Sequence, residues 1–161
     1  MRKTVSVFAS ALLCLAAVFL LASCGGANSM SPEEIAGYII ENVELADLIE
    51  TDRNKIFTSF LNVGENMIKD VKVFVSGSEE KADELIVVRL YSEKDFDPVL
   101  RELNAHINAR AESFAKQSSA ESAKLQNVVI RRTDSCIILV VCEQYKKAAE
   151  VLDELKTREI K

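Results

Sequence analysis

Cys24 is the residue whose chemistry the sequence predicts most directly. It is preceded by small side chains and closes the lipobox Leu21-Ala22-Ser23-Cys24. A basic N-terminus and an apolar run beginning at Val5 lead up to it, which is the order of a secretory signal. We therefore expect cleavage before Cys24 and attachment of acyl chains, such as palmitate, to the new N-terminal residue. Because each buried methylene contributes about 0.8 kcal/mol, two or three chains make a stable membrane anchor.

Two other interpretations of the N-terminal segment fit it less well. Cys14 also lies in the apolar run, but the bulky pair Leu12-Leu13 before it does not suit a narrow peptidase pocket. The run from Val5 to Ala22 is close to the shortest length, about 17 residues, that spans a bilayer, so an uncleaved transmembrane anchor is the alternative. A plain anchor has no need of small residues followed by a cysteine, and this favours lipidation.

The folded part of the chain is expected to lie close to the membrane. Six residues, from Gly25 to Met30, separate Cys24 from the first helix signal, and they reach no further than about 20 Å. The predicted organisation is a signal peptide over 1–23, a lipidated cysteine with a short tether over 24–30, and a single domain over 31–161. The predicted location is the extracytoplasmic face of the cell membrane, with the bilayer bound through the acylated Cys24.

The charge of the chain limits its partners. The formal net charge is −5 at pH 7, and the segment expected to be removed carries the basic residues Arg2 and Lys3 and no acidic ones. The mature domain is therefore more acidic still. Anionic phospholipid and nucleic acid both repel such a domain, so neither nucleic acid nor lipid beyond the anchor is a predicted partner.

The first half of the domain should contain two helices and a hairpin. Ser31-Pro32-Glu33-Glu34 combines a capping serine, a proline in the first turn and a capping-box glutamate, so a helix is expected from there to Ile49. A second, shorter helix is expected over 51–61. Alternating side chains predict strands at 71–76 and 84–91, joined by the polar segment 77–83.

The second half should contain a long helix, another hairpin and a closing helix. Helical spacing from Val99 to Ala115 predicts an amphipathic helix that ends near Lys116, and strands are expected at 128–132 and 135–142. A last helix is expected from Tyr145 to Leu155. The predicted fold is α+β: two antiparallel hairpins form a four-stranded sheet, covered mainly on one face and packed against the long central helix, with N- and C-terminal helices. The apolar run 136–142 predicts a central strand buried on both faces.

Cys136 and Cys142 could suggest a disulfide in an exported protein, but their spacing argues against one. Six residues apart on one strand they share a face and lie about 20 Å from each other at about 3.3 Å per residue. A disulfide needs Cα atoms within about 7 Å. We expect buried free thiols, with a metal or redox role and an intermolecular bridge as the alternatives.

No other cluster predicts catalysis or metal binding. His106 is the single histidine, and beside Leu103 and Ile107 it is expected to be half-buried and structural. No nucleophile elbow or phosphate-binding glycine motif occurs, so no catalytic residue, cofactor or metal ligand is predicted. Phe74, Phe96 and Phe114 fall on expected core faces. The acidic residues near the first hairpin turn lack the alternating ligand pattern of a calcium loop and are expected to be a solvated loop, with a weak cation or partner contact as the alternative: Glu79, Glu80, Asp83 and Glu84.

The chain resembles a family of small lipoproteins from Gram-positive bacteria that carry a domain of unknown function. The likeness covers roughly 54–155. It rests on four features: the strand 71–77 (Val-Lys-Val-Phe-Val-Ser-Gly), the pair Asp83-Glu84, Phe114 near the end of the long helix, and the segment 125–129 (Leu-Gln-Asn-Val-Val). The resemblance implies an envelope lipoprotein of unassigned role and carries over no catalytic residue.

Three functions remain open on the sequence alone. The leading hypothesis is a non-enzymatic, membrane-proximal binding or scaffolding lipoprotein that contacts an unknown envelope protein through its sheet or a sheet edge. The second is an accessory enzyme that acts on cell-envelope material. The third is a small-ligand sensor with a pocket between the long helix and the sheet. An enzyme requires convergent polar groups in a cleft, whereas a binding module requires an exposed apolar patch or an open strand edge.

Overall fold

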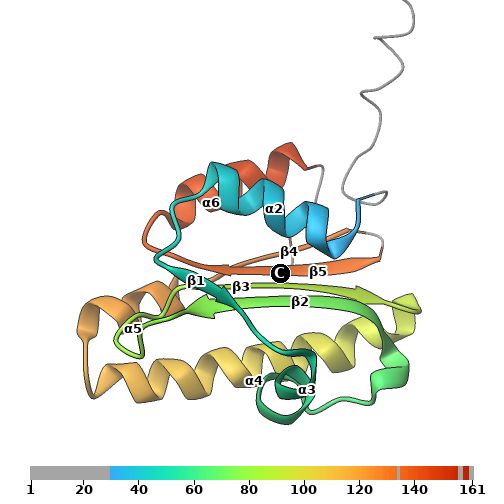
Figure 1. Cartoon of the computed structure of the whole chain (residues 1–161), viewed down its shortest axis with the longest axis horizontal. Coiled ribbons are helices and arrows are strands. Elements are labelled where there is room, and N and C mark those ends of the chain that lie inside the picture. Colours follow the sequence, from blue (N-terminus) through green and yellow to red (C-terminus); the bar gives the residue numbers. More distant parts are fainter. Residues whose placement is uncertain (1–29, 134, 156–157, 160–161) are drawn as a thin grey trace, which may run out of the picture.

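A six-stranded antiparallel sheet forms the middle layer of the domain, and helices cover both of its faces (Figure 1). The computed structural model describes residues 30–133, 135–155 and 158–159. Helices α2 and α6 lie on one face, whereas α3, α4 and α5 lie on the other. The described helices and strands are α2(Pro32–Asn42), β1(Leu48–Glu50), α3(Arg53–Lys55), the π-helix η1(Ile56–Phe60), the 3₁₀ turn η2(Glu65–Met67), β2(Ile68–Ser76), β3(Glu84–Leu90), the 3₁₀ turn η3(Glu93–Asp95), α4(Phe96–Ala115), α5(Ser119–Gln126), β4(Val129–Arg132), β5(Cys136–Val141), α6(Tyr145–Glu154) and β6(Arg158–Glu159).

Helix α2 starts as the sequence predicts but ends early. The capping box is complete, because the Ser31 hydroxyl accepts from the Glu34 N–H at 3.2 Å and the Glu34 carboxylate accepts from the Ser31 N–H at 2.7 Å. The helix ends at Asn42, and Asp47, with a φ of 39°, turns the chain toward the sheet. The expectation of a helix through Ile49 is wrong, because residues 48–50 pair with strand β2 as β1.

The sheet contains both predicted hairpins and two further strands. Its order is β1-β2-β3-β5-β4-β6, so the hairpins β2–β3 and β4–β5 meet where β3 pairs with β5. The four-stranded prediction is corrected by the short strands β1 and β6, which extend the two edges. Each pairs through two or three residues, too few to produce a strand pattern in the sequence.

Strand β5 is buried at every position, as its apolar run predicts. Successive side chains point to opposite faces. Ile137 and Leu139 therefore join the core under α4, while Cys136 and Ile138 join the core under α2 and α6. The expected cover on mainly one face is wrong, because β3 and β5 are apolar on both faces and each face has to be shielded from water.

The remaining helices differ from the prediction in two places. The long helix α4 spans Phe96–Ala115 and buries the expected apolar stripe, and α6 closes the fold at Tyr145–Glu154. The expected helix over 51–61 is a single turn, α3, that runs into the π-helix η1. Helix α5 was not predicted, because it is short and Leu125 is its one large apolar side chain that is buried.

Candidate functional site

The loop end of the sheet is where the chain buries charged side chains. We use this name for the end at which β2 leads into β3 through residues 77–83, with the adjoining connection 43–47 between α2 and β1. The successive carboxylates Asp83 and Glu84 are buried there, and Glu84 is 0% exposed. A buried charge is strongly unfavourable unless it is paired. Helix α4 supplies the partners of Glu84, and helix α5 supplies a partner of Asp83.

Glu84 is held by two side chains of α4. Its Oε2 accepts from Arg110 Nη1 at 2.5 Å, and its Oε1 lies 2.9 Å from His106 Nε2. His106 and Arg110 are four residues apart and so lie on one face of the helix. Their outer sides contact aromatic rings, with Phe60 at 5.0 Å from the imidazole and Phe114 at 5.6 Å from the guanidinium carbon. Both carboxylate oxygens of Glu84 are therefore occupied.

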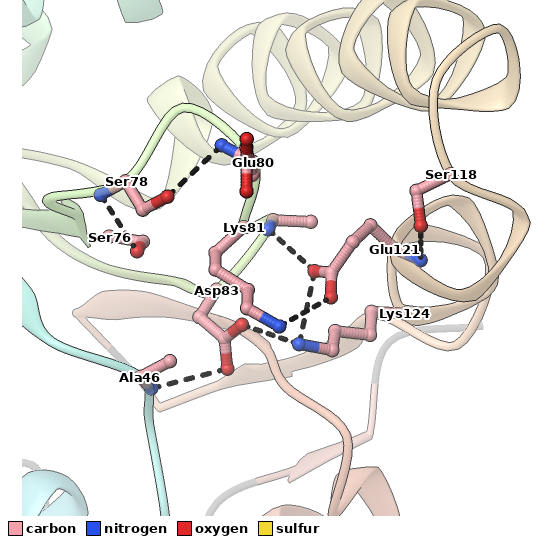
Figure 2. A network of polar contacts seen from close by, with 10 residues as sticks. Ala46, Ser76, Ser78, Glu80, Lys81, Asp83, Ser118, Glu121 and Lys124 are labelled. Atoms are coloured by element: carbon pink, nitrogen blue, oxygen red, sulfur yellow. Dashed lines mark hydrogen bonds and ion pairs between the residues drawn. The ribbon is translucent and has the colours of Figure 1, made fainter.

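Asp83 belongs to a second network, which joins the 77–83 segment to α5 (Figure 2). Lys124 Nζ lies 2.7 Å from Asp83 Oδ2 and 3.0 Å from Glu121 Oε2. Glu121 also accepts from the backbone N–H of Ala82 at 2.8 Å, and its Oε1 lies 3.4 Å from Lys81 Nζ. Two carboxylates and two ammonium groups balance, so the network adds no net charge to the loop end.

The Asp83 network changes the acidity of its members. Burial alone would raise the pKa of Glu121, but the Ala82 N–H and the Lys124 ammonium together lower it. Burial alone would lower the pKa of Lys124, but the hydrogen bonds to Asp83 and Glu121 together raise it. Both groups therefore hold their charged forms. Glu121 and Lys124 therefore act in the network as partners of an ion pair.

Two hollows adjoin the 77–83 segment on its two sides. One, of about 340 Å³, lies between α4 and the sheet and is lined by Phe60, Val75, Ser76, Gly77, Ser78, Glu79, Lys81, His106, Arg110 and Phe114. The other, of about 610 Å³, lies under the α2–β1 connection and is lined by Glu44, Leu45, Ala46, Asp47, Lys81, Asp83, Lys124, Glu143 and Gln144. The first is mixed aromatic and basic, and the second is predominantly acidic.

Strand β1 forms an open edge beside the first hollow. Among the described strands it pairs only with β2. The Thr51 N–H donates to Val73 and the Asp47 carbonyl accepts from Gly77, so the residues that alternate with them, Leu48 and Glu50, direct their backbone groups away from the sheet. An unpaired strand edge is a template for adding another strand.

Ile49 presents an apolar side chain at this edge. It is 60% exposed, and its register partner Val75 lines the first hollow. Its Cδ1 lies 2.7 Å from where a Cβ on Gly77 would be, so the glycine leaves room for the isoleucine to lie across the strand. The edge therefore offers both backbone groups and an apolar contact.

The thiols are placed as the sequence predicts. Cys136 and Cys142 are free and buried, and both belong to the core under α2 and α6, so they share a face. Burial raises the pKa of the Cys142 thiol to about 11, and the negative charge of Asp83 adds to this. A thiol in this state is a poor nucleophile.

The polar predictions were correct in part. His106 does lie between buried Leu103 and Ile107, but its contact with Glu84 was not predicted. Glu79 and Glu80 are exposed as expected of a solvated loop, whereas that interpretation is wrong for Asp83 and Glu84. The spacing of His106 and Arg110 on the apolar face of α4 was a usable signal, because two basic groups on such a face require a buried partner.

The N-terminal predictions fall outside the described residues. These are the signal peptide, the lipobox residues Leu21, Ala22 and Ser23, and the lipidated Cys24. Among the helices that the structure describes, none has the length and apolar character to cross a membrane. In the same part of the chain, no three His, Cys, Asp or Glu side chains are arranged to hold a metal ion.

The fold and the loop end define an α+β domain with a sheet between two helical layers and buried, paired charges at one end of the sheet. The chain belongs to the family described as Domain of unknown function (DUF4358), whose model matches residues 33–142. The match starts and ends earlier in the chain than the expected likeness over 54–155, and it includes the whole loop end. No curated protein and no solved structure matches the chain.

Proposed function

We propose that the protein is an extracytoplasmic lipoprotein, of the kind found in Gram-positive bacteria, whose domain is a non-enzymatic binding module held near the membrane by acylated Cys24. The location rests on the lipobox and the six-residue tether. The open edge of β1, with Ile49 exposed beside it, supports binding as the activity. The proposed partner is an extended segment of an envelope protein that adds to the sheet, because backbone hydrogen bonds and alternate side-chain contacts suit that mode.

The buried charges favour binding over catalysis. His106 and Glu84 do converge, which is a feature an enzyme would share. Glu84, however, is 0% exposed, and both of its oxygens are engaged by α4. A general base must reach the proton that it removes. The pair therefore fits a role in fixing α4 against the sheet better than a role in an accessory enzyme.

Proximity labelling on intact cells tests the binding proposal. The full chain, fused to a labelling enzyme, should enrich specific membrane or wall proteins. An Ile49→Lys variant should lose that enrichment because it places a charge at the β1 edge. Ile40→Lys is the matched control, since Ile40 is also exposed but lies on α2. Equal enrichment by the wild type and Ile49→Lys would reject the edge as the binding surface.

The anchor is tested separately. A Cys24→Ala variant should no longer partition into membranes after processing, and mass spectrometry of the wild type should detect the acyl chains. Continued membrane partitioning of processed Cys24→Ala would exclude lipidation as the means of attachment.

A small-ligand sensor is the second candidate, supported by the hollow between α4 and the sheet. Arg110 and His106 line it together with the rings of Phe60 and Phe114, a combination suited to a small organic anion. Because His106 is the single histidine, its imidazole NMR signals are unique. They should shift on titration with small carboxylates or inorganic phosphate, and unchanged signals at millimolar concentrations would reject this candidate.

A further inference from the structure

The domain begins at a fixed point on the end of the sheet opposite the loop end. Arg89 donates through its guanidinium to the backbone oxygen of Met30, and its Nε lies 3.4 Å from Cys136 Sγ. Met30 also packs against the core under α2 and α6. Met30, the first described residue, is therefore held beside the last residues of β3, at the end of the sheet opposite the loop end.

We call this end the anchor end, and backbone hydrogen bonds connect the segments that form it. The Tyr91 N–H donates to the Met67 carbonyl at 3.1 Å, and the Leu90 N–H donates to the Ser135 carbonyl at 2.8 Å. Tyr91 is 63% exposed, the most exposed large apolar side chain among the described residues. Tyrosine is enriched where proteins meet the membrane interface, because its ring is apolar and its hydroxyl remains hydrated.

The acidic charge of the domain is uneven along the same axis. At the loop end, Glu44, Asp47, Asp83 and Glu143 line one hollow together with Lys81 and Lys124, so its acidic side chains outnumber its basic ones by two. At the anchor end, Lys69 follows Ile68, the partner of Leu90 in the sheet, and Lys94 follows Tyr91 by three residues; both lysines are exposed, as are Glu65 and Glu93. These four exposed charges balance, whereas the hollow at the loop end has an acidic excess.

We propose that the anchor end lies on the bilayer with Tyr91 at headgroup level, so that the loop end and the β1 edge face away from the membrane. This orientation rests on the proposed function, because it requires acylation of Cys24. Strand β3 has seven residues and spans about 20 Å at about 3.3 Å per residue, so it separates the two ends. In Figure 1 the start of α2, coloured blue, and the arrowhead of β2, which leads into the loop end, lie on opposite sides of the molecule.

Single-tryptophan variants can measure this orientation, because the chain contains no tryptophan. The probe is Tyr91→Trp at the anchor end, and the matched control is Ile49→Trp at the exposed β1 edge of the loop end. Each full-length protein is produced in cells that acylate lipoproteins and is reconstituted into phosphatidylglycerol–phosphatidylcholine vesicles. A fraction of the phospholipid carries a nitroxide on its headgroup, which quenches nearby indole fluorescence.

The expected result is several-fold stronger quenching of Tyr91→Trp than of Ile49→Trp. Equal quenching, or stronger quenching of Ile49→Trp, in acylated protein that floats with the vesicles would overturn the orientation alone. Protein whose mass shows an unmodified Cys24 and that does not float would instead overturn the proposed anchoring, and the orientation with it. Circular dichroism of both variants identifies any change of fold. The double variant Tyr91→Phe with Ile49→Trp repeats the control measurement in a protein that lacks the Tyr91 hydroxyl.

Discussion

Removing Arg110 should destabilise the domain much more than removing its partner charge. Glu84 is 0% exposed, whereas the Arg110 side chain is 21% exposed. An Arg110→Met variant keeps most of the side-chain volume but leaves the carboxylate buried with His106 as its remaining partner. Breaking a buried pair in this way costs about 3–5 kcal/mol. We expect the lower part of that range, because His106 still holds one oxygen at 2.9 Å.

The reverse substitution should be milder. Glu84→Gln keeps the shape and can still accept a hydrogen bond, and the arginine that it leaves behind has access to water. We expect a cost of about 1–2 kcal/mol, the lower part of the range of about 1–3 kcal/mol for an unsatisfied polar group. The double variant Glu84→Leu with Arg110→Met should be far more stable than the sum of its parts, because replacing a whole buried pair by apolar groups is often neutral.

Urea unfolding followed by circular dichroism measures these differences. With a slope of about 1–3 kcal/mol per molar urea, Arg110→Met should lower the midpoint by about 1 M or more. Lys147→Met is the control, because Lys147 and Glu150 form an exposed pair at 4.0 Å that contributes less than about 1 kcal/mol. A cost for Arg110→Met no greater than that for Glu84→Gln would refute the assignment of Glu84 as the desolvated partner.

Three further predictions concern stability in acid, the Cys142 thiol in base and the N-terminal cap of α2. Because the pKa of Glu121 is lower in the folded state, its carboxylate stabilises the fold above pH 4.5, and this contribution is lost as the pH falls through the folded-state pKa. Glu121→Gln should therefore flatten the acid side of a stability–pH curve measured by urea unfolding. The Cys142 thiol should resist alkylation at neutral pH unless the protein unfolds, and stability should fall between pH 9.0 and about 11, where only the unfolded thiol ionises. Ser31→Ala should cost about 0.5–2 kcal/mol in thermal or urea unfolding, because the capping hydroxyl on α2 is lost, whereas Ser113→Ala, at an exposed position within α4, should cost less.

The central strands and the long helix were predictable because long-range packing and local pattern agree there. The run 136–142 is apolar at every position, and burial on both faces of β5 is the simplest consequence. Helix α4 has an apolar stripe over twenty residues, which outweighs any competing local preference. Both hairpins followed from the strands and the polar segments between them.

The short elements were missed because tertiary pairing, not local preference, creates them. Strand β1 exists through its three partners on β2, and in isolation residues 48–50 suit the end of a helix equally well. Helix α5 has few apolar residues, but Ser118 and Glu121 repeat the capping pattern, and the Ser118 hydroxyl does accept from the Glu121 N–H. That pattern was the available signal.

Glu84 was misread for a related reason. A carboxylate next to a polar turn is usually solvated, and its burial depends on α4 supplying Arg110 from more than twenty residues away. The sequence indicates the burial of Glu84 only when two distant segments are considered together: the polar turn that contains the carboxylate, and the helix that has a basic pair on an otherwise apolar face. The basic pair on α4 indicates that a buried acidic partner exists, but it does not indicate which residue that partner is.

The buried charged residues and the open edge of β1 are connected by hydrogen bonds and ion pairs. Asp83 accepts from the Ala46 N–H at 3.4 Å, so the network that ties the 77–83 segment to α5 also holds the connection leading into β1. Glu84, the next residue, fixes the same segment to α4 through Arg110. The position of the β1 edge is thus set by its backbone pairing with β2, supported by ion pairs on both sides of one turn, more than by apolar packing of β1, which is half-buried at Leu48 and exposed at its other two residues. An edge held in this way stays ordered while its outward backbone groups remain unpaired, which is what strand addition by a partner requires.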